Sequence, residues 1–67
     1  MEANTTLLTE PLLDVAQAAQ LLNVRPSWLR EAVRGRRIPY LKLGKHVRFE
    51  RAALEGWVAS QRVSERP

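Results

Sequence analysis

The chain has 67 residues, enough for one small domain, and it contains no cysteine and a single histidine, which excludes disulfides and a metal site built from thiolate or imidazole ligands. No apolar run approaches the roughly 18 residues of a membrane span, and the N-terminus lacks the basic flank and long apolar stretch of a signal peptide. These features predict a soluble, cytoplasmic domain that binds no metal or other cofactor. Because 45% of the residues are hydrophobic, we expect this domain to be folded.

Charge is distributed in three blocks along the chain. Residues 1–24 carry three acidic and no basic side chains, residues 25–51 carry nine basic and two acidic ones, and residues 52–67 are balanced. The overall charge of +4 therefore comes from the central block. A charge concentrated in this way is typical of proteins that bind a polyanion, and the alternative interpretation is a solvated basic face.

Residues 12–61 hold the periodic part of the sequence, so we predict that they form the domain. Residues 1–11 show no hydrophobic period and are predicted to be a flexible N-terminal arm, and residues 62–67 are predicted to be a frayed tail. The alternative at the end of the arm is a short strand around Leu12 and Leu13 that pairs with a later hairpin.

The first helix is predicted to follow Asp14 and to end at Asn23. The Asp14 carboxylate can accept hydrogen bonds from the first turn, and Gln17 stands three residues later, as in a capping box. Asn23 tolerates the left-handed conformation that commonly ends a helix. Between these ends, apolar residues recur at i, i+3, i+4 and i+7, the spacing of one helix face: Val15, Ala18, Ala19 and Leu22.

A second helix is predicted to begin at Pro26, because proline suits the first helical position, and to stop near Gly35. Its inward face would hold Leu29, Ala32 and Val33. Its outward face would hold Ser27, Trp28, Arg30, Glu31 and Arg34.

From Tyr40 to Phe49 the sequence alternates with a period of two, as strands do. Gly44 and Lys45 at the centre are predicted to form a two-residue hairpin turn with glycine first. The alternation predicts that one face of this hairpin is apolar and the other basic. The apolar face would hold Leu41, Leu43, Val47 and Phe49, and the basic face Tyr40, Lys42, His46 and Arg48.

A third helix is predicted after Glu50, which is a weak N-cap. Gly56 lies inside this helix at a cost of about 1 kcal/mol relative to alanine. It either permits close packing or only weakens the helix. The inward face would hold Ala53, Leu54, Trp57 and Val58.

Two short helices joined by a three-residue turn form a helix-turn-helix, whose second helix lies in the major groove of DNA. An arginine there can donate two hydrogen bonds to guanine or bind a phosphate. With the basic hairpin, the predicted fold is a winged helix-turn-helix, mainly α with a small β-hairpin wing. DNA contacts are predicted on the second helix at Arg25, Ser27, Trp28, Arg30, Glu31 and Arg34, and on the loop and wing at Arg36, Arg37, Lys42, Lys45, His46 and Arg48.

Several short motifs stand in the order that is typical of one family. They are LLDVAQAAQLLNV at residues 12–24, Ile38-Pro39 before the wing, Gly44 followed by basic residues at the wing tip, and RAALE at residues 51–55. Over residues 12–61 the chain resembles the excisionase-type, MerR-like winged-helix DNA-binding domains. Two positions depart from that family: its serine at the start of the recognition helix is Arg25 here, and its glycine before Ile-Pro is displaced to Gly35. We therefore expect the loop into the wing to differ in shape.

The resemblance implies a small excisionase, or recombination directionality factor. Excisionases do no chemistry: they bind adjacent DNA sites cooperatively, bend the DNA and direct an integrase toward excision of a phage or other element. The implied partners are double-stranded DNA, an integrase or other recombinase, and further copies of the chain.

Two alternatives to an excisionase stay open at this point. A small MerR-like transcriptional regulator is placed second, because nothing as long as a dimerisation helix follows Gln61. A basic module that binds an acidic protein is placed third. The sequence holds no paired carboxylates, Ser-His-Asp set or glycine-rich phosphate loop, so we do not expect an enzyme.

Overall fold

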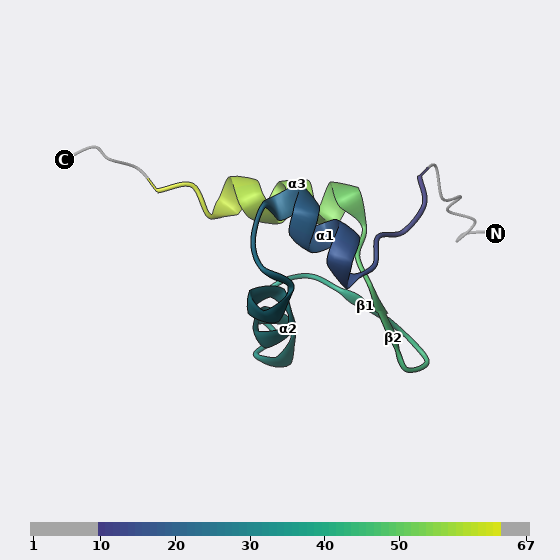
Figure 1. Ribbon diagram of the computed structural model, residues 1–67. Coiled ribbons are helices and arrows are strands. Elements are labelled where there is room, and N and C mark those ends of the chain that lie inside the picture. The colour runs from purple at the N-terminus through teal and green to yellow at the C-terminus, as the bar shows by residue number, and fades with distance from the viewer. Residues whose placement is uncertain (1–9, 64–67) are drawn as a thin grey trace.

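The computed structural model describes residues 10–63, which form three α-helices and a two-stranded antiparallel sheet (Figure 1). The helices are α1 (Val15–Leu22), α2 (Pro26–Arg34) and α3 (Arg51–Ser60), and the strands are β1 (Leu41–Leu43) and β2 (His46–Arg48). The order of these elements is that of a winged helix-turn-helix, which confirms the predicted fold. The predicted arm and tail fall largely on residues 1–9 and 64–67, which lie outside the described residues.

Both ends of α1 are fixed by local hydrogen bonds. The Asp14 carboxylate accepts from the Gln17 N–H (2.8 Å), and the Gln17 side-chain oxygen accepts from the Asp14 N–H (3.0 Å), which closes the predicted capping box. Asn23 adopts φ 59° and ψ 46°, and the following Val24 donates its N–H to the Ala19 carbonyl (2.9 Å). These bonds satisfy backbone groups that the helix leaves without partners, and they confirm both predicted caps.

The ends of α2 are less regular. Pro26 is its first residue, and no side chain of the described residues caps it at Arg25. At the other end Gly35 has φ −85°, and the next residue, Arg36, is the one in the left-handed conformation (φ 57°). The Arg37 N–H then reaches back to the Ala32 carbonyl (2.8 Å). The left-handed position that usually holds glycine is therefore occupied by arginine, so the loop into the wing has its own shape.

The core receives one or more side chains from each helix and from the base of the wing. Alanines of α1 and α2 allow the two helices to lie close together, and the residues predicted to face inward on both helices are buried or half-buried. The fully buried residues are Ala18, Ala19, Leu29, Ala32, Ile38, Phe49 and Leu54.

Helix α3 covers this core with only part of its length. Leu54 is buried and Trp57 is half-buried, with its indole N–H donating to the Arg37 carbonyl (2.9 Å). Val58 was predicted to face inward, but its side chain is 45% exposed. Val58 faces α1 across a groove that it lines with Leu21 and Leu22, and it is exposed because this groove is open to the surface. A β-carbon at Gly56 would meet no described atom within 4 Å, so this glycine weakens α3 and serves no close contact.

The base of the wing is joined to the start of α1. Leu13 and Phe49 exchange two backbone hydrogen bonds, each 2.8 Å long, and form an isolated antiparallel bridge. This bridge confirms that the end of the arm pairs with the hairpin, as the alternative interpretation held, but it is a single bridge at Leu13 and not a strand. Because Phe49 is also buried in the core, the wing is held to the helices at its base.

The register of the hairpin contradicts the predicted division of its faces. Its pairs are Leu41 with Arg48, Lys42 with Val47, and Leu43 with His46. Residues directly opposite each other on antiparallel strands project to the same side. One face therefore carries Lys42 with Val47, and the other carries the two leucines with His46 and Arg48.

The reason for this error is the two-residue turn, which is present as predicted, with Gly44 at positive φ (64°). A turn of two residues pairs an odd-numbered position with an even-numbered one. An alternation continued unchanged through the turn therefore places the second strand on the wrong face. Each face of the wing is mixed, and neither is purely apolar or purely basic.

Candidate nucleic-acid interface

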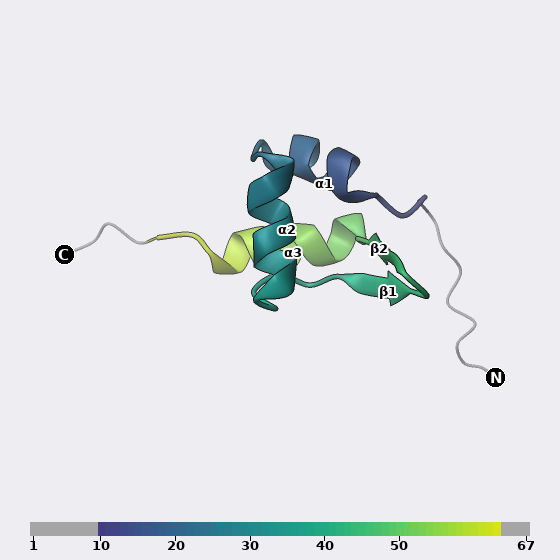
Figure 2. The ribbon, with the colours of Figure 1, turned by 60° about the horizontal axis from the view of Figure 1, so that its bottom comes forward.

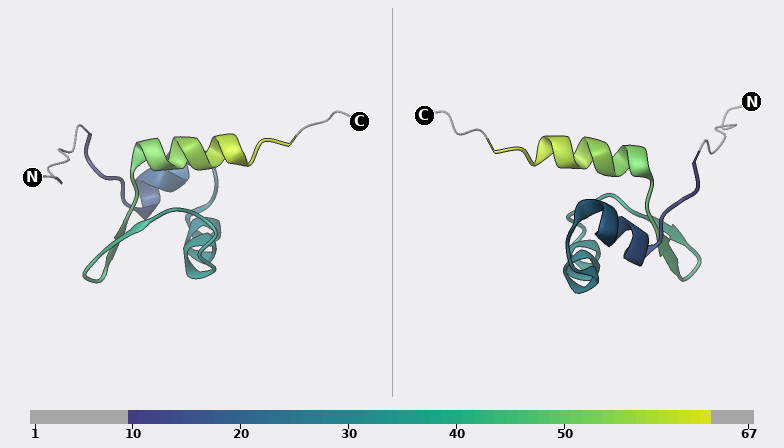
Figure 3. Two further views of the ribbon diagram at one scale, coloured as in Figure 1. Left: turned by 180° about the vertical axis from the view of Figure 1, so that it is seen from behind. Right: turned by 45° about the horizontal axis from the view of Figure 1, so that its top comes forward.

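Helix α2 and the hairpin project from the same side of the layer formed by α1 and α3 (Figures 1 and 3). Seen from that side, α2 crosses in front of α3, and the hairpin lies beside the first turns of α3 (Figure 2). A groove of about 330 Å³ lies between α2 and the wing. Its lining residues are Val15, Arg30, Val33, Arg34 and Val47.

The outward face of α2 is polar and exposed along its whole length. Four of its residues stand at i, i+3, i+4 and i+7, so they form one stripe: Ser27, Arg30, Glu31 and Arg34. Trp28 lies beside this stripe with 43% of its surface exposed. All the side chains that the sequence assigned to DNA contact on α2 are therefore accessible, and Arg30 and Arg34 also line the groove toward the wing.

Within this stripe Glu31 and Arg34 form an ion pair. The distance from the Arg34 Nη1 atom to the Glu31 Oε2 atom is 3.4 Å, and the two side chains are 76% and 61% exposed. Glu31 is the only acidic residue of α2. The sequence assigned both residues to DNA contact separately, but the structure brings them together.

The loop after α2 presents two adjacent arginines. Arg36 and Arg37 are both exposed. The loop is held from both sides, because the Arg37 N–H bonds to the end of α2 and the Arg37 carbonyl accepts the Trp57 indole. Their charges are therefore carried on a fixed backbone between α2 and the wing.

The wing distributes its cations over both faces and the tip. Lys45 is exposed in the turn, and Lys42 is exposed on the same face as Val47, which lines the groove toward α2. His46 and Arg48 lie on the other face. Arg48 is half-buried and donates from Nη1 to the Val47 carbonyl (2.8 Å).

Three features of this surface were missed from the sequence. Val47 faces the groove, whereas Leu43 is 48% exposed near the wing tip among cationic neighbours. The two-residue turn carried the signal for both, because it fixes which residues share a face. Arg51, the last cation of the basic block, bonds through Nε to Glu10 Oε1 (3.1 Å) and lines a separate hollow with residues of α1.

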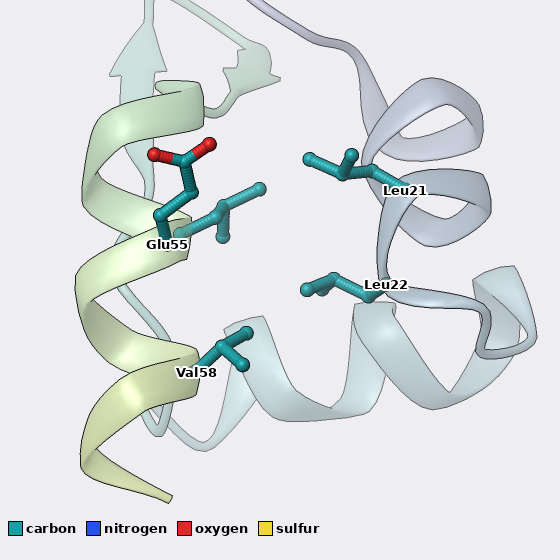
Figure 4. A pocket seen from close by; sticks show the side chains of 5 residues that line it. Leu21, Leu22, Glu55 and Val58 are labelled. Carbon is teal, nitrogen blue, oxygen red and sulfur yellow. The ribbon is translucent and has the colours of Figure 1, made fainter.

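The side of the molecule between α1 and α3 differs from the side that carries α2 and the wing in its charged residues. A second groove, of about 240 Å³, lies between these two helices (Figure 4). No basic side chain of the described residues lines it. Its lining residues are Leu21, Leu22, Leu54, Glu55 and Val58. The groove beside α2, which is lined by three valines and two arginines, and this groove therefore lie between different pairs of elements.

A comparison with known families bears directly on this arrangement. The sequence profile of the family described as "Helix-turn-helix domain" matches residues 12–62, which include every helix and strand described above. The chain belongs to this helix-turn-helix domain family. The match confirms the helix-turn-helix interpretation of the sequence and indicates that the protein binds DNA. No curated protein and no solved structure matches the chain.

Other kinds of site receive no support from the described part of this helix-turn-helix protein. Helix-turn-helix DNA-binding families are typically non-enzymatic. Within residues 10–63, no three side chains of the metal-binding types come together, and no helix is both long enough and apolar enough to cross a membrane. The narrower assignment to excisionases of the MerR-like type stays a prediction.

Proposed function

We propose that this protein is a small excisionase that binds double-stranded DNA with sequence specificity, α2 lying in the major groove and the wing contacting the neighbouring backbone. The observation that supports this proposal is the common direction of α2 and the wing, which share one groove lined by Arg30 and Arg34. A recognition helix and a cationic wing on one side of the domain fit the alternating grooves of a duplex.

The exposed side chains divide by the contacts that they are suited to make. Arg30 and Arg34 lie on the central stripe of α2, where an arginine can read guanine through O6 and N7. We assign phosphate or sugar contacts to the remaining predicted positions. These residues lie beside the stripe, at its first turn, or on the loop and the wing. They are Arg25, Ser27, Trp28, Arg36, Arg37, Lys42, Lys45, His46 and Arg48.

Cooperative binding follows from the size of the domain. A single module of this kind buries only about 600–1,000 Å² on DNA, so one copy binds weakly. Copies on adjacent sites gain affinity from mutual contacts that raise their effective concentration. We infer that the acidic N-terminal segment of one copy meets the basic block of the next, and that the assembly bends the DNA and directs an integrase toward excision. Such a protein acts in the cytoplasm, with the bacterial DNA.

Salt dependence tests whether the protein binds DNA at all. If several phosphates are contacted, affinity for a random duplex falls by about three decades or more between 50 and 200 mM salt. We expect this loss in fluorescence anisotropy titrations of a labelled duplex. Weak binding that does not change with salt would instead support a basic module that binds an acidic protein.

Substitution of the wing tip shows whether the wing takes part. Lys45 is exposed in the turn and stands apart from the core, so Lys45→Ala should leave folding intact. It is expected to weaken binding to all duplexes alike and to lower the salt slope by about 1. An unchanged slope would exclude a phosphate contact at the tip.

The form of the complexes separates an excisionase from a transcriptional regulator. On DNA from an attachment region, gel shifts should show a ladder of cooperative bands, and circular-permutation assays should show strong bending. A single dimer band on a palindromic site would instead indicate a small MerR-like regulator.

A further inference from the structure

The carboxylate of Glu31 stands in a surface that is otherwise built for a polyanion. It lies on the exposed stripe of α2 between Arg30 and Arg34. DNA phosphates repel a carboxylate placed there. The exposed pair with Arg34 contributes little to helix stability, so stability alone does not explain an acidic residue at this position.

We propose that Glu31 is a positioning residue for base recognition, which orients the Arg34 guanidinium toward a base and keeps phosphates from capturing it. This inference rests on the proposed DNA-binding function. It assigns specificity to a pair of residues, where the sequence indicated separate contacts.

The geometry of the pair leaves Arg34 able to read a base. Glu31 contacts the Nη1 atom at 3.4 Å, and a guanidinium has five N–H donors in a rigid fork. Donors on its other nitrogens therefore stay available for the two parallel bonds that guanine O6 and N7 accept. Because both side chains are more than half exposed, a base in the major groove can reach them.

The electrostatic effect of Glu31 differs between specific and non-specific complexes. In a non-specific complex, an unrestrained arginine binds any phosphate within reach, and this contact carries no sequence information. Glu31 competes for that guanidinium and repels the phosphate. In the specific complex Arg34 contacts a base, so the carboxylate continues to orient it. Glu31 thus lowers affinity for random DNA more than affinity for the specific site.

Glu31→Gln removes the charge with almost no change of shape, and Glu55→Gln is the matched control. Glu55 is also an exposed glutamate on a helix, but it lines the apolar groove between α1 and α3. On a random duplex we expect Glu31→Gln to bind about three- to tenfold more tightly than wild type, with a salt slope steeper by about 1. Glu55→Gln should change the affinity less than twofold. Equal effects of the two variants would reduce Glu31 to a general charge effect and overturn the proposal.

Selection from duplexes with a randomised central segment tests the link to Arg34. Wild type should enrich one base pair that Arg34→Ala no longer selects, with a loss of preference of tenfold or more. Glu31→Gln should relax the same base pair, and the double variant should relax it no further. Relaxation at a different base pair would mean that Glu31 reads its own base, and unchanged preference would mean that it has no role; either result overturns the inference.

The same selection separates failure of the inference from failure of the proposed function. A wild-type protein that binds no duplex, or enriches no sequence, refutes specific DNA binding itself. A wild-type protein that selects a site while Glu31→Gln selects it equally well refutes only the role of Glu31.

Discussion

The helix pair and the wing depend on contacts of different range along the chain. The ends of α1 are set by side chains within a few residues of them, as in the capping box of Asp14 with Gln17 and the left-handed Asn23. The wing is set by the bridge between Leu13 and Phe49 and by the pairing of its two strands. The scaffold of this interface is therefore encoded by local signals, whereas the placement of the cationic wing depends on the long-range bridge between Leu13 and Phe49.

The energetic consequence is that the two regions tolerate change differently. Each strand of the wing has three residues, and a two-stranded hairpin alone is at best marginally stable in water. Its position therefore depends on the buried side chain at its base. Removal of this side chain should unfold the domain, whereas changes farther out in the wing should lower its stability less.

The largest effect is expected from Phe49→Ala. Removing a fully buried phenylalanine costs about 3–5 kcal/mol, and the core of a domain this small supplies a stability of about the same size. We expect no cooperative transition in urea denaturation followed by circular dichroism. Leu43→Ala, at an exposed leucine of the same wing, should change the free energy of unfolding by less than about 0.5 kcal/mol. Similar losses of unfolding free energy in both variants would contradict the distinction between the base of the wing and its tip.

A smaller effect on the stability of the domain is expected from Gly44→Ala. The residue has φ 64°, and its added β-carbon would meet no described atom within 4 Å, so the penalty is conformational and amounts to about 1–2 kcal/mol. Gly56→Ala adds the same methyl group inside α3, also into open space, and should stabilise the protein by about 1 kcal/mol. Urea titrations of the two variants should therefore shift in opposite directions. An unchanged or raised stability of Gly44→Ala would show that the turn does not need its glycine.

This difference in range explains which features could be predicted from the sequence. The bounds of α1 and α2 and their inward faces follow from caps, Pro26 and apolar spacing, all of which are local signals. The faces of the wing follow from the predicted two-residue turn, and the error was to continue the alternation unchanged through that turn. The exposure of Val58 depends on how closely α3 packs against α1, which no local signal shows.

The candidate site divides in the same way. The predicted residues of α2 are exposed, because the helical period alone places them on the side opposite the core. The pairing of Arg51 with Glu10 joins positions far apart in the chain, and no local pattern indicates it. The half-buried state of Arg48 likewise depends on how the wing packs against the rest of the domain, which no local pattern shows.

The smallest effect on stability is expected at Arg36, in the loop that joins the helix pair to the wing. Its left-handed conformation (φ 57°) is unfavourable for arginine by about 1–2 kcal/mol, a cost that glycine does not have. Glycine also raises the conformational entropy of the unfolded chain, which lowers stability by about 0.4–1 kcal/mol. Arg36→Gly should therefore stabilise the domain by about 0.5 kcal/mol, while the loss of one cation weakens DNA binding.

Arg37→Gly is the matched control, since it removes the same charge one residue later. Among residues 10–63 only Asn23 and Arg36 are non-glycine residues with positive φ, so glycine at 37 relieves no strain and should destabilise the domain by about 0.4–1 kcal/mol. Thermal unfolding and salt-dependent DNA titrations of both variants measure the two effects separately. If Arg36→Gly lowers stability as much as Arg37→Gly does, the left-handed conformation of Arg36 does not strain the folded domain. If it gains stability and loses affinity, the arginine is kept there for its charge, and the loop belongs functionally to the wing.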